Sequence, residues 1–60
     1  MGRKQKRIRQ VDYYTKEEIE VYESMELAAF DNYITERAIS FAINHNDGKI
    51  DNKELRFEVV

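Results

Sequence analysis

The sequence predicts a mainly α-helical domain, with two helices over about 15–30 and 33–44, then a tight loop and a short C-terminal helix or strand. Three observations favour this fold class. A helix-capping signal begins at Thr15, no proline or glycine occurs between Arg3 and Asp47, and the apolar residues in that stretch recur at helical spacing. Together they indicate that the middle of the chain is helical.

The first helix is predicted to begin at Thr15. The segment 15–18, TKEE, fits a capping box, in which the Thr15 hydroxyl accepts from the Glu18 amide and the Glu18 carboxylate accepts from the Thr15 amide. Tyr14 and Ile19 occupy the two positions of a hydrophobic staple across this helix start. Both signals therefore place the N-cap at the same residue.

The apolar residues of the central region form two stripes rather than one. At the period of an α-helix, one face carries Val21, Tyr22, Met25, Ala28 and Ala29, and the nearly opposite face carries Leu27, Phe30, Ile34, Ala38 and Phe41. Because a single straight helix would need partners on both sides, two helices are favoured, with Asp31 or Asn32 as the second N-cap. One continuous helix is the alternative in a dimer, where a second chain would cover the other face.

The C-terminal segment permits a second fold class. Apolar and charged residues alternate over 55–59, as they do in a half-buried strand, and the chain ends in two valines. A β-hairpin that pairs 39–44 with 50–59 would make the domain α+β, which is the alternative fold class. Against this hairpin, the helical spacing of apolar residues continues as far as Phe41.

The loop between these segments resembles the second half of an EF-hand calcium loop. When Gly48 is placed at the glycine of that loop, Asp51 and Glu54 fall on ligand positions. The first two ligand positions hold Ile43 and His45, which supply none of the oxygen ligands that calcium requires. The sequence therefore predicts no metal site here, and no motif indicates a cofactor.

A basic N-terminus precedes an acidic body, so we divide the chain into a basic arm, 1–12, and one small globular domain, 13–60. The cations of the arm are Arg3, Lys4, Lys6, Arg7 and Arg9. The rest of the chain has five basic and twelve acidic residues, so the net charge of −2 combines +5 with −7. Such arms are typical of nucleic-acid-binding proteins, although a merely solvated terminus would look the same. Ile8 and Val11 also allow a short strand within 7–13.

The size of the chain indicates that it self-associates. A 60-residue domain has a marginal core, and this one has no cysteine for a disulfide and no Cys/His cluster for zinc. Association of two copies is the remaining common source of stability, so a homodimer is predicted. The predicted dimer interface consists of apolar residues from the helical region, namely Met25, Leu27, Phe30, Ile34 and Phe41.

The residues needed for catalysis are missing, which favours a binding protein. The chain has no cysteine, a single histidine and no glycine-rich phosphate loop. The main interpretation is a non-enzymatic protein-binding regulator or inhibitor, like the compact proteins of phages and mobile elements in size and composition. The predicted contact surface combines acidic and tyrosine side chains, namely Glu20, Glu23, Glu26, Tyr22 and Tyr33.

The alternative function is a nucleic-acid-binding module that uses the basic arm to grip phosphates. An acidic body opposes this function unless its carboxylates are held away from the nucleic acid. No apolar run is long enough to cross a membrane, and the basic start is not followed by the apolar segment of a signal peptide. A cytoplasmic location is therefore the default expectation.

Overall fold

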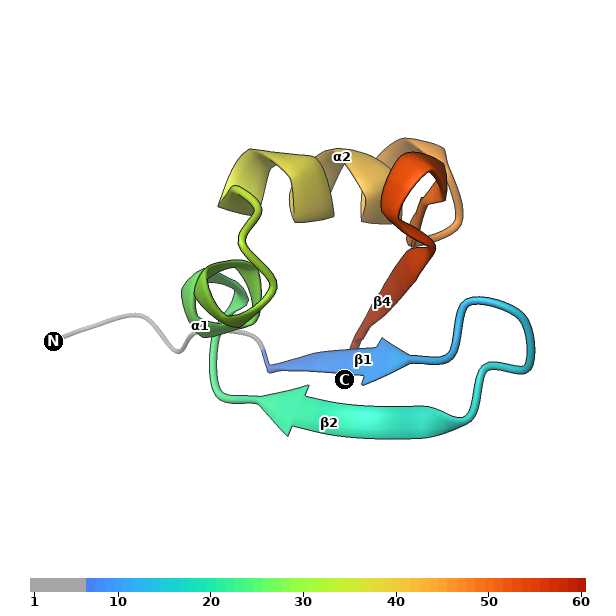
Figure 1. Cartoon of the computed structure of the whole chain (residues 1–60). Coiled ribbons are helices and arrows are strands. Elements are labelled where there is room, and N and C mark those ends of the chain that lie inside the picture. Colours follow the sequence, from blue (N-terminus) through green and yellow to red (C-terminus); the bar gives the residue numbers. More distant parts are fainter. Residues whose placement is uncertain (1–6) are drawn as a thin grey trace, which may run out of the picture.

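The chain folds as an antiparallel four-stranded sheet with two helices, so the prediction of a mainly α-helical domain is wrong and the α+β alternative fits. The computed structural model describes residues 7–60. The sheet has the order β2-β1-β4-β3, and both helices lie on the same side of it (Figure 1). In chain order the elements are β1 (Ile8–Val11), β2 (Glu18–Tyr22), α1 (Met25–Asp31), α2 (Glu36–His45), β3 (Lys49–Ile50), the 3-10 helix η1 (Asp51–Lys53) and β4 (Leu55–Val59).

Most of the predicted first helix, 15–30, is instead a hairpin. Residues 12–17 form the turn between β1 and β2, and the side chain of Asp12 accepts hydrogen bonds from the amides of Tyr14 and Thr15, both at 2.8 Å. The Thr15 hydroxyl accepts from the Glu17 amide at 3.2 Å and does not cap a helix. The aspartate, which lies before the supposed capping box, therefore directs the backbone into a turn.

The N-cap of α1 is Ser24, nine residues after the predicted one. Its backbone is extended, and its side-chain oxygen accepts from the Leu27 amide at 3.3 Å. Ser24 is also buried, with 7% of its surface exposed. A buried cap satisfies an amide that water cannot easily reach, so its loss is expected to cost more than the loss of an exposed turn contact.

Removal of this cap tests the position at which the helix starts. Ser24→Ala should lower the free energy of unfolding by about 1 kcal/mol, which corresponds to several degrees in the melting temperature of a domain this small. Thr15→Ala is the matched control and should change the free energy by less than about 0.5 kcal/mol. Thermal melts followed by circular dichroism measure both, and a larger loss at Thr15 would contradict the assignment of the hairpin.

The second predicted helix exists, but it begins later. It was predicted over 33–44 with Asp31 or Asn32 as its cap, whereas α2 spans Glu36–His45 and its N-cap is Thr35, which accepts from the Ala38 amide at 3.1 Å. The hairpin of the alternative is also wrong in detail, because 39–44 is helical. Strand β4 does form within 50–59, and it pairs with β1 and with the two-residue strand β3.

The core lies between the two helices and the central strands. Its fully buried members are Ile8 of β1, Ala28 and Ala29 of α1, Ile39 of α2 and Phe57 of β4. These four elements therefore each contribute to a shared apolar layer, and the short strand that the sequence allows within 7–13 is present as β1. Because β1 takes up residues 8–11 of the predicted arm, 1–12, Arg9 of that arm is part of the sheet.

Tyr22 connects the sheet to the first helix. Its hydroxyl donates to the Asp31 carboxylate at the end of α1, over 2.6 Å. Burial of the ring, assisted by the bond to this carboxylate, raises the pKa of Tyr22 to about 12. The contact therefore fixes α1 to the edge strand β2.

Among residues 7–60, no helix has the length and apolarity that a membrane span requires.

Candidate functional site

Helices α1 and α2 form a helix-turn-helix pair. Four residues, 32–35, separate the end of α1 at Asp31 from the start of α2 at Glu36. Figure 1 shows α1 end-on and α2 from the side, so the two axes cross steeply rather than running side by side. A short turn and a steep crossing are the features of a helix-turn-helix unit.

The turn between the helices is built around Asn32 and Tyr33. The Asn32 amide donates to the carbonyls of Ala28 and Ala29, at 3.3 and 3.2 Å, and its side chain donates to the Ala28 carbonyl at 2.8 Å. Tyr33 has a φ of 59°, in the left-handed region, and its side chain is 92% exposed. Asn32 therefore ends α1, and the left-handed residue after it redirects the chain into α2.

The outward face of α2 carries polar side chains at helical spacing. Arg37, Phe41 and Asn44 are exposed and stand at positions i, i+4 and i+7, whereas Ile39 and Ala42 are buried against the rest of the fold. Ser40, which precedes Phe41 in the sequence, accepts a hydrogen bond from the Asn44 side-chain amide at 3.4 Å. This face therefore combines a cation, an amide and an aromatic ring on one exposed helix.

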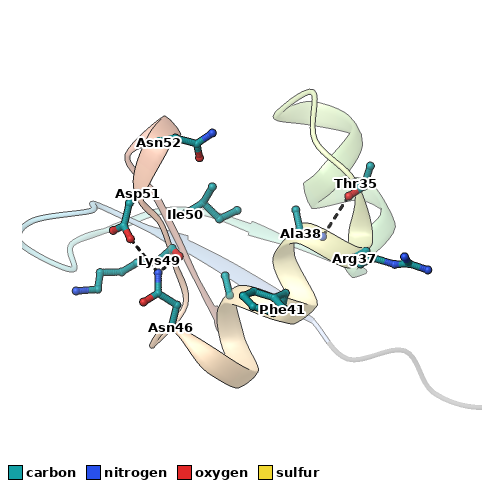
Figure 2. Close-up of a pocket in the computed structure, with 10 residues that line it drawn as sticks. Thr35, Arg37, Ala38, Phe41, Asn46, Lys49, Ile50, Asp51 and Asn52 are labelled. Carbon is teal, nitrogen blue, oxygen red and sulfur yellow. Dashed lines mark hydrogen bonds between the residues drawn. The ribbon is translucent and has the colours of Figure 1, made fainter.

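A groove of about 520 Å³ lies beside this face, between α2 and the segment that contains β3 and η1 (Figure 2). Its apolar lining comes from Ala38, Phe41 and Ala42 of α2 and from Ile50 of β3. Its polar lining comes from Thr35, Arg37, Asn46, Lys49, Asp51 and Asn52. Two cations and one carboxylate give this lining a charge of +1 in a chain whose net charge is −2.

The carboxylates of the loop that resembles a calcium site point to different partners. Asp47 accepts from Arg56 at 2.7 Å, Glu54 accepts from the Tyr14 hydroxyl at 2.6 Å, and Asp51 accepts from the Tyr13 hydroxyl. The bond from Tyr13 holds the pKa of the Asp51 carboxyl below its usual value. Within residues 7–60, no three side chains of metal-ligating type gather at one place. Failure to bind calcium stays a prediction.

The residues predicted to contact a protein come from different elements of the fold, and their role in a protein contact stays a prediction. Glu20 is on the edge strand, Glu23 is in the connection to α1, Glu26 is exposed on α1, and Tyr33 is in the turn between the helices. Tyr22 is half-buried and bonded to Asp31. Residues 18–22 are a strand, whose side chains alternate between faces, so Glu20 and Glu26 do not lie on one helix.

The predicted dimer residues are divided between the core and the surface. Met25 and Ile34 pack against the core. Phe30 and Leu27 are 81% and 49% exposed on the outer face of α1, while Phe41 is 63% exposed beside the groove of α2. The exposed members of the predicted dimer interface therefore lie on two different helices. A dimer stays a prediction.

The predicted nucleic-acid-binding cations also differ in their surroundings. Arg3, Lys4 and Lys6 lie outside the described residues. Arg7 is exposed directly before β1, and its carbonyl accepts from the Val60 amide at 3.0 Å. Arg9 is engaged on the sheet, where it contacts Glu58 at 2.9 Å and Glu18 at 3.6 Å. The guanidinium of Arg9 is therefore committed to the fold.

The strand order separates the carboxylates of β2 from the groove beside α2. Glu18 and Glu20 are on β2, which forms one edge of the sheet, while β3, beside the groove, forms the other edge. The sequence analysis did not single out Arg37, Phe41 and Asn44, although their spacing places them on one helical face. Searches of protein families, of curated proteins and of solved structures find no significant match to this chain.

Proposed function

We propose that this protein is a nucleic-acid-binding module that places α2 in the major groove of duplex DNA, with the basic N-terminus on the adjoining phosphates. The observation that carries the proposal is the helix-turn-helix pair whose second helix exposes Arg37 and Asn44 on one face. Arginine pairs with guanine and asparagine with adenine in the major groove. The proposal includes no enzymatic activity.

The start of the described chain supports this mode of binding. Ile8 packs against Ala28 and Ala29 of α1, so the chain enters the fold beside the helix pair. Arg7, which is exposed directly before Ile8, therefore adds a positive charge close to the helices.

The salt dependence of binding tests this function. A fluorescent random-sequence 20-base-pair duplex is titrated with the protein at several salt concentrations, and anisotropy is followed. Binding should weaken steeply with salt, because each neutralised phosphate contributes roughly −0.9 to the slope of log K against log salt. Replacing Arg3, Lys4 and Lys6 by glutamine should make that slope about 3 units less negative.

Lys16→Gln provides the control for a change in charge alone, because Lys16 lies in the hairpin turn and contacts Glu58 at 3.8 Å. It should leave the slope unchanged. Failure to bind the duplex at micromolar to millimolar protein and low salt would contradict the proposal. A slope that is insensitive to the three N-terminal substitutions would contradict the role of the arm.

A second candidate is favoured by the exposed apolar residues of α1. Leu27 and Phe30 stand three residues apart on its outer face, and this arrangement is typical of a protein contact. We propose that a protein, including a second copy of this chain as first predicted, covers this pair. Sedimentation equilibrium tests the second copy directly, since a dimer that Phe30→Asp dissociates would support it and a monomer at all concentrations would oppose it.

A further inference from the structure

The groove beside α2 has an apolar floor and polar ends. Ala38 and Phe41 face Ile50 across it, while Arg37 lies toward one end and Lys49 toward the other (Figure 2). An apolar floor next to the proposed contact face of α2 has no role in gripping phosphates, which require cations and hydrogen-bond donors. In the proposed complex, a partly apolar group of the DNA would therefore lie against this floor.

We propose that this groove receives the major-groove edge of a thymine and reads its C5-methyl group. The inference rests on the proposed function. Thymine is the only base of unmodified DNA with a methyl group in the major groove, and alanine and phenylalanine are among the side chains that contact it. Phe41 is 63% exposed, and its ring packs against the ring of His45 with centroids 4.8 Å apart, so it can contact the methyl group without repacking of the core.

The charges around the groove are compatible with a base edge and less so with a phosphate. Lys49 lies on the opposite side of the apolar floor from Arg37, where it can meet a phosphate beside the base (Figure 2). Asp51 lines the same groove, and its carboxylate would repel a phosphate placed on the floor itself. The cation on one side and the acidic lining therefore favour a base edge on the floor and a backbone contact beside it.

The spacing along α2 sets the register of the contact. Arg37 and Asn44 are seven residues apart, and hence about 10 Å along a helix axis, close to three base-pair steps of about 3.4 Å. Phe41 lies between them, four residues after Arg37. The thymine is therefore expected between the base pair contacted by Arg37 and the one contacted by Asn44.

This inference also commits the ligand to DNA. RNA contains uracil, which lacks the methyl group, and its A-form major groove is too deep and narrow for side chains to read. A duplex RNA should therefore bind only through its phosphates. The proposal thus predicts a preference for DNA over RNA of the same sequence at equal salt.

The experiment removes the methyl group and leaves the base-pairing sequence unchanged. Two pools of the same 20-base-pair DNA, selected from a random library for binding to the full chain, are prepared, one with thymine and one with deoxyuridine in its place, and each is titrated with the full chain. The deoxyuridine pool should bind about three- to fivefold more weakly, as expected for loss of one buried methyl-sized group. RNA of the same sequences should bind no better than the deoxyuridine pool.

Variants assign the effect to the groove. Phe41→Ala should reduce the difference between the two DNA pools, because it removes the aromatic ring from the groove, whereas Phe30→Ala, which removes an exposed phenylalanine from α1, should keep the full difference. Equal affinity of the unaltered protein for both pools, with duplex binding intact, would overturn this inference and leave the proposed function standing. An undiminished difference in Phe41→Ala would also overturn it, because the effect would then come from the shape of the duplex. Loss of all duplex binding would instead refute the proposed function.

Discussion

Gly48→Ala should unfold the domain, and this is the largest effect that we expect from any single substitution. Gly48 follows α2 with a φ of 80°, a conformation that costs an L-residue roughly 1–2 kcal/mol. A Cβ atom at this position would be 2.1 Å from the backbone oxygen of Phe57. That separation is far below van der Waals contact, so the backbone of β4 or of the loop would have to move.

Hydrogen bonds on both sides of Gly48 prevent that movement. The Phe57 amide donates to the Gly48 carbonyl and the Gly48 amide donates to the Ala42 carbonyl, each over 2.8 Å. Any shift therefore breaks the connection between α2 and β4. A core of this size supplies only about 3–5 kcal/mol of net stability, which the combined strain and lost bonds should exceed.

Circular dichroism measures the outcome. Gly48→Ala should lack the far-ultraviolet signal and the cooperative melt of the parent protein at 25 °C. Asn52→Ala, on the exposed η1 segment nearby, is the control and should change stability by less than about 0.5 kcal/mol. A Gly48→Ala protein that melts within a few degrees of the parent would contradict the close approach of this loop to β4.

Arg37→Ala should give the largest loss in DNA binding among single substitutions on α2. Arg37 is exposed in the first turn of α2, the part of a recognition helix that contacts base edges. A bidentate arginine–guanine contact contributes about 1–3 kcal/mol, so the affinity for a preferred sequence should fall roughly 5- to 150-fold. The fall should be smaller for random-sequence duplex, which is held mainly through phosphates.

Lys16→Ala is the matched control, because it removes one exposed positive charge from the hairpin turn. A duplex selected from a random library by the unaltered protein serves as the probe, and competition with unlabelled random duplex measures the preference. Arg37→Ala should reduce that preference, whereas Lys16→Ala should not. Equal losses for the two variants would show that net charge alone, and not the face of α2, governs binding.

The sequence predicted a helix correctly where the spacing of its apolar residues is typical of a helix and not of a strand. Most of α2 was predicted because its apolar residues keep helical spacing as far as Phe41, and the alternation over 55–59 correctly allowed a strand. The stretch 15–22 was wrongly predicted as helix, because TKEE fits a capping box and the residue that organises the turn, Asp12, precedes it. Asp12 and the pairing of β2 with β1 settle the choice, and a local helical pattern does not reveal that non-local pairing.

The candidate site was predicted only in part. The excess of cations near the N-terminus was visible in the sequence, but the commitment of Arg9 to Glu58 depends on the pairing of β1 with β4. The groove was not visible at all, because it forms where α2 packs beside β3 and η1. Residues as far apart as Thr35 and Asn52 line it, and only the folded chain brings them together.

The central claim is that the outer face of α2 contacts duplex DNA, and a nuclear magnetic resonance titration tests it most directly. Isotope-labelled protein is titrated with a short duplex while the backbone and side-chain amide signals are followed. The largest shifts should come from Arg37, Ser40 and Asn44, including the Asn44 side-chain amide, with further shifts at Arg7. Shifts confined to the face of α1 that carries Leu27 and Phe30, or no shifts at millimolar duplex and low salt, would contradict the claim.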